Sequence, residues 1–221
     1  MKRQIALDTE TTGLLCYDGH RIMEIGCVEI IDRKITKNIF HSYLNPERRI
    51  DPEARDITGL NEIFLQTKPK FLSIVNDFFK FLENADEIII HNANFDINFI
   101  NNELKLVNFR VTDIRKYFDI FDTLSFARKK HPGKRNNLNA LCSRYNIDNQ
   151  NRDKHSALVD AKLLAEVYLA MTSNQSEINY SMNDLNVDSI INDLKVDILR
   201  ANIQDIKKHV LYVQKIIQNV K

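Results

Sequence analysis

The sequence has few cysteines, no long apolar run and almost no net charge, and each shortage excludes a class of protein. No run of about 18 apolar residues occurs, which argues against a transmembrane helix and membrane partners. Cys16, Cys27 and Cys142 fit neither a zinc-site spacing nor a paired disulfide framework, so we expect a cytoplasmic protein. The first four residues lead directly into an apolar run, which leaves no room for a signal peptide.

The charges nearly cancel, because 31 Lys and Arg residues face 30 Asp and Glu residues, for a net charge of +1. Such a balance lacks the global basic footprint of a duplex-binding protein. Basic residues are nonetheless concentrated in residues 128–154, where a Pro-Gly turn presents Lys134 and Arg135 just before His155. A basic surface there suits a phosphate backbone, although each single residue also fits an ordinary solvated surface.

Acidic residues recur in three short motifs, which read DTETTG at 8–13, HNANFD at 91–96 and HSALVD at 155–160. Hydrolysis of a phosphodiester requires a shielded phosphate, an ionised water and a stabilised leaving oxygen. Two Mg²⁺ or Mn²⁺ ions about 3.5–4 Å apart supply all three. Converging carboxylates without a cysteine fit these hard ions better than Zn²⁺. The motifs together predict a two-metal nuclease site.

The first motif places two acids at the end of a buried strand. Asp8 and Glu10 follow the apolar run at 4–7, and their spacing of two puts both carboxylates on one face of the strand. Two acids on the inward face of a central strand are costly unless a cation pairs them, so we expect metal ligands. The alternative is that Asp8 caps a turn while Glu10 is exposed.

The other two motifs each open a predicted helix. Asp96 lies in the first turn of a helix at 96–106, where an acid is also favourable simply because of the helix dipole. His155 lies in a loop or first turn before a helix at 156–171, with Asp160 about one turn later. Because histidine titrates near neutral pH, His155 suits a general base, although a surface histidine is the alternative for this motif alone.

In this order the motifs resemble the DEDDh family of 3′–5′ exonucleases, which have a ribonuclease H-like fold. Within it, residues 4–172 resemble the proofreading epsilon subunits of bacterial DNA polymerase III. The more specific matching segments read PGKRNNLNALCSRYNID and HSALVDAKLLAEVYLAMT. One departure is Asn94, where epsilon-like sequences usually carry a small alanine two residues before a ligand.

The resemblance implies a role for each matching residue. The ligands of two Mg²⁺ or Mn²⁺ ions would be Asp8, Glu10, Asp96 and Asp160, and the general base would be His155. The 3′-terminal nucleotide would contact a wider set, which consists of Asp8, Glu10, Thr11, Thr58, Gly59, Leu60, Phe95, His155 and Asp160.

The predicted fold class is α/β, a ribonuclease H-like mixed five-stranded sheet flanked by helices, with a C-terminal helical tail. A first strand ending at Asp8 and strands at 22–30 and 35–44 are expected to form an antiparallel meander. The later predicted elements, in chain order, are a helix near 70–83, a strand at 87–91, a helix at 96–106, a strand near 117–121, and helices near 122–130, 137–146 and 156–171.

The composition changes after Thr172, so we predict an exonuclease domain at 1–172, a polar linker at 173–185 and an amphipathic helical tail at 186–221. The linker contains Gln175, Ile178 and Tyr180, spaced as in peptides that dock on the bacterial sliding clamp. This pattern is short and also arises by chance.

The tail carries an apolar stripe with alternating spacings of three and four, which must be buried somewhere. The stripe includes Leu199, Ile203, Ile206, Val210, Val213 and Ile217. It can pack on the catalytic domain, pair with a second copy or dock on another protein. The resemblance favours docking on the polymerase alpha subunit.

The function predicted from these observations is removal of mispaired nucleotides from single-stranded or mispaired DNA 3′ ends by a proofreading subunit. One alternative is a free-standing DEDDh exonuclease that trims RNA or DNA ends with the same catalytic residues. A scaffold with an inactive nuclease fold is disfavoured, because none of the acids and histidines of the site is lost.

Overall fold

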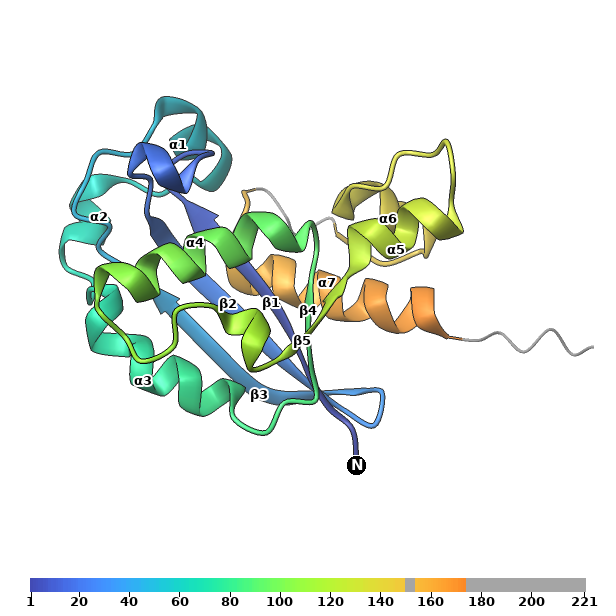
Figure 1. Cartoon of the computed structure of the whole chain (residues 1–221). Coiled ribbons are helices and arrows are strands. Elements are labelled where there is room, and N and C mark those ends of the chain that lie inside the picture. Colours follow the sequence, from blue (N-terminus) through green and yellow to red (C-terminus); the bar gives the residue numbers. More distant parts are fainter. Residues whose placement is uncertain (150–153, 174–221) are drawn as a thin grey trace, which may run out of the picture. The chain divides into compact units, whose positions relative to one another are not determined.

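A five-stranded mixed sheet forms the centre of residues 1–149 and 154–173, the part of the chain that the computed structural model describes (Figure 1). The strand order is β3-β2-β1-β4-β5, in which β1–β2 and β2–β3 are antiparallel and β1–β4 and β4–β5 are parallel. The strands are β1 (Arg3–Thr11), β2 (Ile22–Ile31), β3 (Lys34–Tyr43), β4 (Glu87–Ile90) and β5 (Asp119–Asp122). The predicted mixed α/β sheet, including its antiparallel meander, is confirmed.

Helices cover both faces of this sheet (Figure 1). One face packs on α3 (Phe71–Leu82) and α4 (Ala93–Leu106). The other packs on α7 (Ala157–Thr172), joined by α5 (Thr123–Lys130) and α6 (Leu138–Arg144). The short helices α1 (Pro52–Thr58) and α2 (Glu62–Gln66) follow β3. The three-layer arrangement buries apolar side chains on both sides of the sheet. Full burial of one large apolar side chain stabilises the folded state by about 1.5–3 kcal/mol.

The alternation of side chains along β1 decides which residues face which layer. Ile5 and Leu7 belong to the core under α3 and α4, whereas Ala6 belongs to the core under α7. Asp8 and Glu10 continue the series of Ala6, so their side chains leave the strand on the α7 side. The spacing of two therefore directs both acids toward the helix that carries the third motif.

Two helices and two strand boundaries differ from the sequence predictions. Strand β1 runs to Thr11, three residues beyond its predicted end at Asp8, because it stays paired with β2 through Glu10 and, after a bulge, through Thr11. The five- and seven-residue helices α2 and α1 were not expected, because each is too short to show an apolar periodicity. The last strand begins at Asp119 and not at Tyr117, because Ile114–Lys116 forms a 3₁₀ turn that Tyr117 ends.

Helix α4 begins at Ala93, three residues before its predicted start. Asn92 adopts the left-handed conformation (φ 66°, ψ 53°) directly after β4, which turns the chain into the helix at once. Asn94 therefore lies in the first turn of the helix, together with Asp96. The left-handed backbone conformation of Asn92 is one that asparagine tolerates better than most residues.

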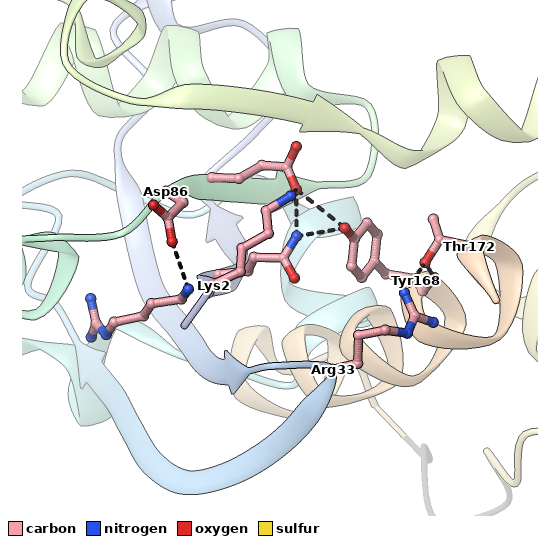
Figure 2. A network of polar contacts seen from close by, with 8 residues as sticks. Lys2, Arg33, Asp86, Tyr168 and Thr172 are labelled. Carbon is pink, nitrogen blue, oxygen red and sulfur yellow. Dashed lines mark hydrogen bonds and ion pairs between the residues drawn. The ribbon is translucent and has the colours of Figure 1, made fainter. Parts of the chain in front are cut away.

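A network of polar contacts joins α7 to the sheet (Figure 2). It involves Gln4, near the start of β1, whereas Asp8 and Glu10 lie near the end of that strand. Gln4 donates from Nε2 to both the hydroxyl of Tyr168 and the carboxylate of Glu87. The Tyr168 hydroxyl donates to the same Glu87 oxygen at 3.2 Å, and Arg33 donates to Thr172 at 3.1 Å. These contacts hold the C-terminal half of α7 against β1 and β4, which helps to place its N-terminus at the site.

The predicted clamp-binding peptide and the apolar stripe of the tail lie at residues 174–221, outside the described residues. None of the helices in the described ranges combines the length and apolar character needed to cross a membrane.

Candidate active site

All five residues expected to carry the chemistry line one cavity of about 400 Å³. Asp8 and Glu10 come from the carboxyl-terminal part of β1, and Asp96 comes from the first turn of α4, directly after β4. His155 precedes α7, and Asp160 lies in its first turn. Segments about 60 to 150 residues apart in the chain thus contribute to a single cavity, as the motifs predict.

His155 lies between two of the carboxylates. Its Nδ1 is 3.2 Å from Oδ2 of Asp160 and 4.0 Å from Oε1 of Glu10. The imidazole is 44% exposed, whereas the side chains of Glu10 and Asp160 are 13% and 4% exposed. One polar atom from each of these three residues lies within 4.8 Å of the others, so the imidazole stands directly beside two of the expected metal ligands.

Asp96 is buried and is oriented by Thr9, the residue between the two acids of β1. Its Oδ1 accepts hydrogen bonds from the Thr9 backbone N–H at 3.0 Å and from the Thr9 hydroxyl at 2.7 Å. Burial raises the pKa of Asp96 to about 7; the nearby Asp122 carboxylate acts in the same direction and the Thr9 hydrogen bonds act against it. Removal of this carboxylate from water therefore disfavours its charge in the metal-free protein.

The composition of the cavity fits hard divalent cations. Its lining, all from described residues, contains the four carboxylates of Asp8, Glu10, Asp96 and Asp160 but no lysine, arginine or cysteine. Carboxylates so close together repel one another unless cations lie among them, and Mg²⁺ and Mn²⁺ prefer oxygen ligands. The expected ligand set is therefore chemically consistent with the cavity that it lines.

A second cavity, of about 340 Å³, lies beside the first and shares Thr9, Glu10 and Phe95 with it. Thr11 and Thr58, which were expected to contact the nucleotide, also line it. These residues place a space of nucleotide dimensions next to the carboxylates.

Gly59 and Leu60, expected beside Thr58, line neither cavity in the described structure. Gly59 ends α1 with a positive φ of 73° and faces the side chain of Lys154. Leu60 packs against a small buried cluster that includes Met23 and Leu65. The structure therefore does not place these two residues in the second cavity.

Three apolar residues of the second cavity were not identified from the sequence. Leu14, Leu15 and Ile57 line it with side chains that are 72%, 42% and 51% exposed. The signal that could have found the leucines is their position directly after the first motif, where a turn carries two large apolar residues. Ile57 has no such signal, because nothing in the sequence marks α1 as part of the site.

The basic stretch contributes to a third cavity, of about 640 Å³, which shares His91 and Asn137 with the carboxylate cavity. Arg128 and Lys134 line this third cavity. Arg144 has a structural role, since it donates to the side chain of Asn136 at 3.0 Å and to the carbonyl of Arg135 at 2.7 Å. Part of the predicted basic surface therefore continues directly from the site.

Comparison with known proteins gives the family. Residues 5–168 match the exonuclease family model of the RNase T type. DNA polymerase III subunit epsilon of Salmonella typhimurium is 49% identical over 184 residues, which cover 81% of this chain and 75% of that protein. The epsilon subunit of Buchnera aphidicola subsp. Baizongia pistaciae is 43% identical over 228 residues, which cover 98% of this chain and 93% of that protein. The chain belongs to the DNA polymerase III epsilon subunit family. It is an exonuclease.

Solved structures of other exonucleases share the fold of this epsilon-family chain. Exonuclease X in complex with 5′-overhanging duplex DNA superposes with a TM-score of 0.59 at 25% identity, covering 80% of this chain and 93% of that one. Exonuclease I of Escherichia coli in complex with a dA16 oligonucleotide has a TM-score of 0.68 at 14% identity, covering 80% and 42%. The predicted ribonuclease H-like exonuclease fold is confirmed.

Proposed function

We propose that this chain is the proofreading 3′–5′ exonuclease of a bacterial replicative polymerase. It removes mispaired nucleotides one at a time from DNA 3′ ends and releases nucleoside 5′-monophosphates. The supporting observation is that four carboxylates and His155 line one cavity beside a second cavity of nucleotide size. A subunit of this kind acts in the cytoplasm with the replication machinery.

The four acids of the first cavity, Asp8, Glu10, Asp96 and Asp160, are the proposed residues that would hold two Mg²⁺ or Mn²⁺ ions. When bound, the ions neutralise charge on the phosphate and the leaving oxygen and allow water to ionise at neutral pH. Thr9 orients Asp96 for this task through its two hydrogen bonds. Ligand positions fixed in advance lower the reorganisation needed when substrate arrives.

His155 is the proposed general base. Its Nδ1 lies 3.2 Å from the Asp160 carboxylate, so the ring stands beside a proposed metal ligand, where it can take a proton from the attacking water. The half-exposed ring can pass that proton on to solvent after the phosphodiester bond breaks.

The second cavity explains the preference for unpaired ends. Leu14, Leu15 and Ile57 give it an apolar wall, and Phe95 and Thr58 complete it. We propose that a terminal base enters this cavity after it leaves its partner strand. Unpairing costs less at a mismatch than at a matched pair, so mispaired and single-stranded 3′ ends should react faster.

The central experiment is digestion of 5′-labelled primer–template DNA by the purified full-length protein. Matched and mismatched primers are compared, each with Mg²⁺ and with excess EDTA. We expect shortening one nucleotide at a time, faster from the mismatched primer and absent in EDTA. Digestion that persists in EDTA, or that starts from the 5′ end of a 3′-labelled strand, contradicts the proposed reaction.

The alternative function, a free-standing exonuclease that trims RNA or DNA, is tested in the same assay with an RNA primer. The proteins that bind this chain also distinguish the two functions. The proofreading function predicts that the polymerase alpha subunit co-purifies through residues 186–221, and the sliding clamp through Gln175, Ile178 and Tyr180. Deletion of residues 174–221 should remove both partners while the nuclease activity of the remaining chain persists. Co-purification that survives the deletion contradicts this assignment.

A further inference from the structure

Ser156 departs from the usual behaviour of a serine at the start of a helix. It is the N-cap residue of α7 and directly follows His155, yet its side chain makes no capping hydrogen bond to the helix. An N-cap serine normally accepts a hydrogen bond from a backbone N–H of the first turn. Here the hydroxyl instead donates to Oε1 of Glu24 on β2, at 2.8 Å. The Ser156 hydroxyl therefore bonds to the sheet and does not cap α7.

Glu24 is a buried carboxylate placed beside the site. It is 1% exposed and lies directly opposite Glu10 in the β1–β2 pairing. The oxygen that accepts from Ser156 also lies 2.7 Å from Nε2 of His41 on β3. A buried carboxylate is costly without such partners, so these two contacts stabilise Glu24. They also link Ser156 before α7 to His41 on β3 through one oxygen. Tyr43 lies directly opposite Glu24 in the β2–β3 pairing and so stands on the same face of the sheet.

The backbone that follows Ser156 rests directly on the same face of β2. A Cβ atom on Gly26 would come within 2.3 Å of the Ala157 carbonyl carbon and 2.4 Å of the Leu158 nitrogen. Only glycine permits this approach, and Gly26 is two residues from Glu24, so both face α7. The first turn of α7 is therefore seated on β2 at its backbone and fastened there by Ser156.

The chain before Ser156 is fastened to a different element. The backbone N–H of His155 donates to the carbonyl of Ile57 at 3.1 Å, and Nζ of Lys154 donates to the carbonyl of Asp56 at 2.6 Å. Both acceptors belong to α1, which also forms a wall of the second cavity. His155 thus projects from a short segment held by α1 on one side and by β2 on the other.

We propose that Ser156 and Glu24 are positioning residues for His155. They fix the backbone from which the half-exposed imidazole projects, so that Nδ1 stays beside Asp160 and the ring stays at the carboxylate cavity. This inference rests on the proposed role of His155 as the general base. A displacement of about 1 Å in such a group can reduce a rate by on the order of 10²-fold, so the contact bears on kcat.

The test is a double-mutant cycle on the full-length protein, with kcat and KM measured on a 5′-labelled mismatched primer. The variants are Ser156→Ala, His155→Ala and the combination of both. We expect Ser156→Ala to lower kcat by roughly tenfold with little change in KM. In the His155→Ala background the same substitution should have almost no effect, because a positioning residue acts only through the group it positions. Ser156→Thr, which keeps the hydroxyl, should restore most of the rate.

Thr36→Val is a matched control. The Thr36 hydroxyl on β3 donates at 2.8 Å to Glu29, a buried carboxylate of β2, in the same pair of strands but beyond the site. Its loss removes a contact of the same type and length, and kcat should remain that of the native protein. The proposal is overturned if Ser156→Ala retains the native kcat, or if it lowers kcat equally with and without His155. A native kcat in His155→Ala instead contradicts the general base itself, which is a failure of the proposed function.

Discussion

Thr9 donates two hydrogen bonds to the same oxygen of Asp96, from its backbone N–H at 3.0 Å and its hydroxyl at 2.7 Å. Thr9 lies between Asp8 and Glu10 in the chain, but its side chain leaves β1 on the opposite face, where α4 packs. One strand therefore supplies two acids on one face and orients a third acid from the other. Thr9, which separates the two acids of the first motif, thus orients the acid of the second motif.

Thr9→Val should weaken metal activation without unfolding the protein. Valine keeps the shape of threonine but removes the hydroxyl that orients Asp96. Loss of a hydrogen bond to a metal ligand typically costs about 10- to 100-fold in metal affinity, so the Mg²⁺ concentration for half-maximal activity should rise by about tenfold or more. Titration of nuclease activity with Mg²⁺ measures this. An unchanged Mg²⁺ requirement would show that Thr9 does not tune the ligand.

Asp96→Asn should stabilise the metal-free protein at alkaline pH. The pKa of Asp96 is raised by burial from 3.8 to about 7, so the folded state binds more protons than the unfolded state between these values. Stability from this group is therefore greatest at low pH and falls as pH rises through about 7. The asparagine variant avoids that loss. Thermal unfolding in EDTA should show a higher Tm than the native protein at pH 8 and a smaller difference at pH 5; a lower Tm at pH 8 would contradict the prediction.

Asp8→Ala and Asp160→Ala should each abolish turnover, because each removes a proposed ligand from the carboxylate cavity. The measurement is single-turnover digestion of the mismatched primer in Mg²⁺. Ligand removal should also eliminate the increase in Tm that Mg²⁺ gives the native protein, since binding to the folded state alone stabilises it. Full nuclease activity in either variant would overturn the ligand assignment.

His155→Ala should reduce kcat by on the order of 10²–10⁴-fold, the usual contribution of a general base. The imidazole lies 3.2 Å from Asp160 but is not a proposed metal ligand, so the Mg²⁺-dependent increase in Tm should remain. This combination of lost rate and retained metal binding separates the base from the ligands. A much smaller loss of rate would point to another residue as the base.

Glu103→Ala should destabilise the fold through a buried ion pair distant from the chemistry. Glu103 is 1% exposed and accepts two hydrogen bonds of 2.7 Å from Arg21 and one of 3.2 Å from the backbone of Ile22. Removing one partner of a buried pair costs about 3–5 kcal/mol, because the remaining charge stays uncompensated. Urea unfolding measures the loss. Lys70→Ala, which breaks the exposed pair with Glu47, is the control and should leave the unfolding midpoint almost unchanged, because water screens that pair.

Local periodicity made much of the fold predictable. Strand alternation put Asp8 and Glu10 on one face, and the helical spacing of apolar residues predicted α3, α4 and α7 nearly to their observed bounds. Prediction from apolar periodicity failed for elements too short to show a repeat. The helices α1 and α2 are not visible in the sequence, and with α1 the contribution of Ile57 to the site was missed.

The five residues proposed to carry the chemistry could be selected from the sequence because each lies in a short motif of a few positions. Three other features could not be read from a motif, because they are tertiary contacts. These are the grouping of the five residues in one cavity, the orientation of Asp96 by Thr9 and the hydrogen bond from Ser156 to Glu24. These contacts join residues about 90 to 130 positions apart, and only the packing of α4 and α7 on opposite faces of the sheet brings them together. By itself the sequence determined which groups are present and which face of its own element each one takes. The tertiary structure alone decided which of them touch, because side-chain periodicity acts over a few residues whereas contact depends on how whole elements pack.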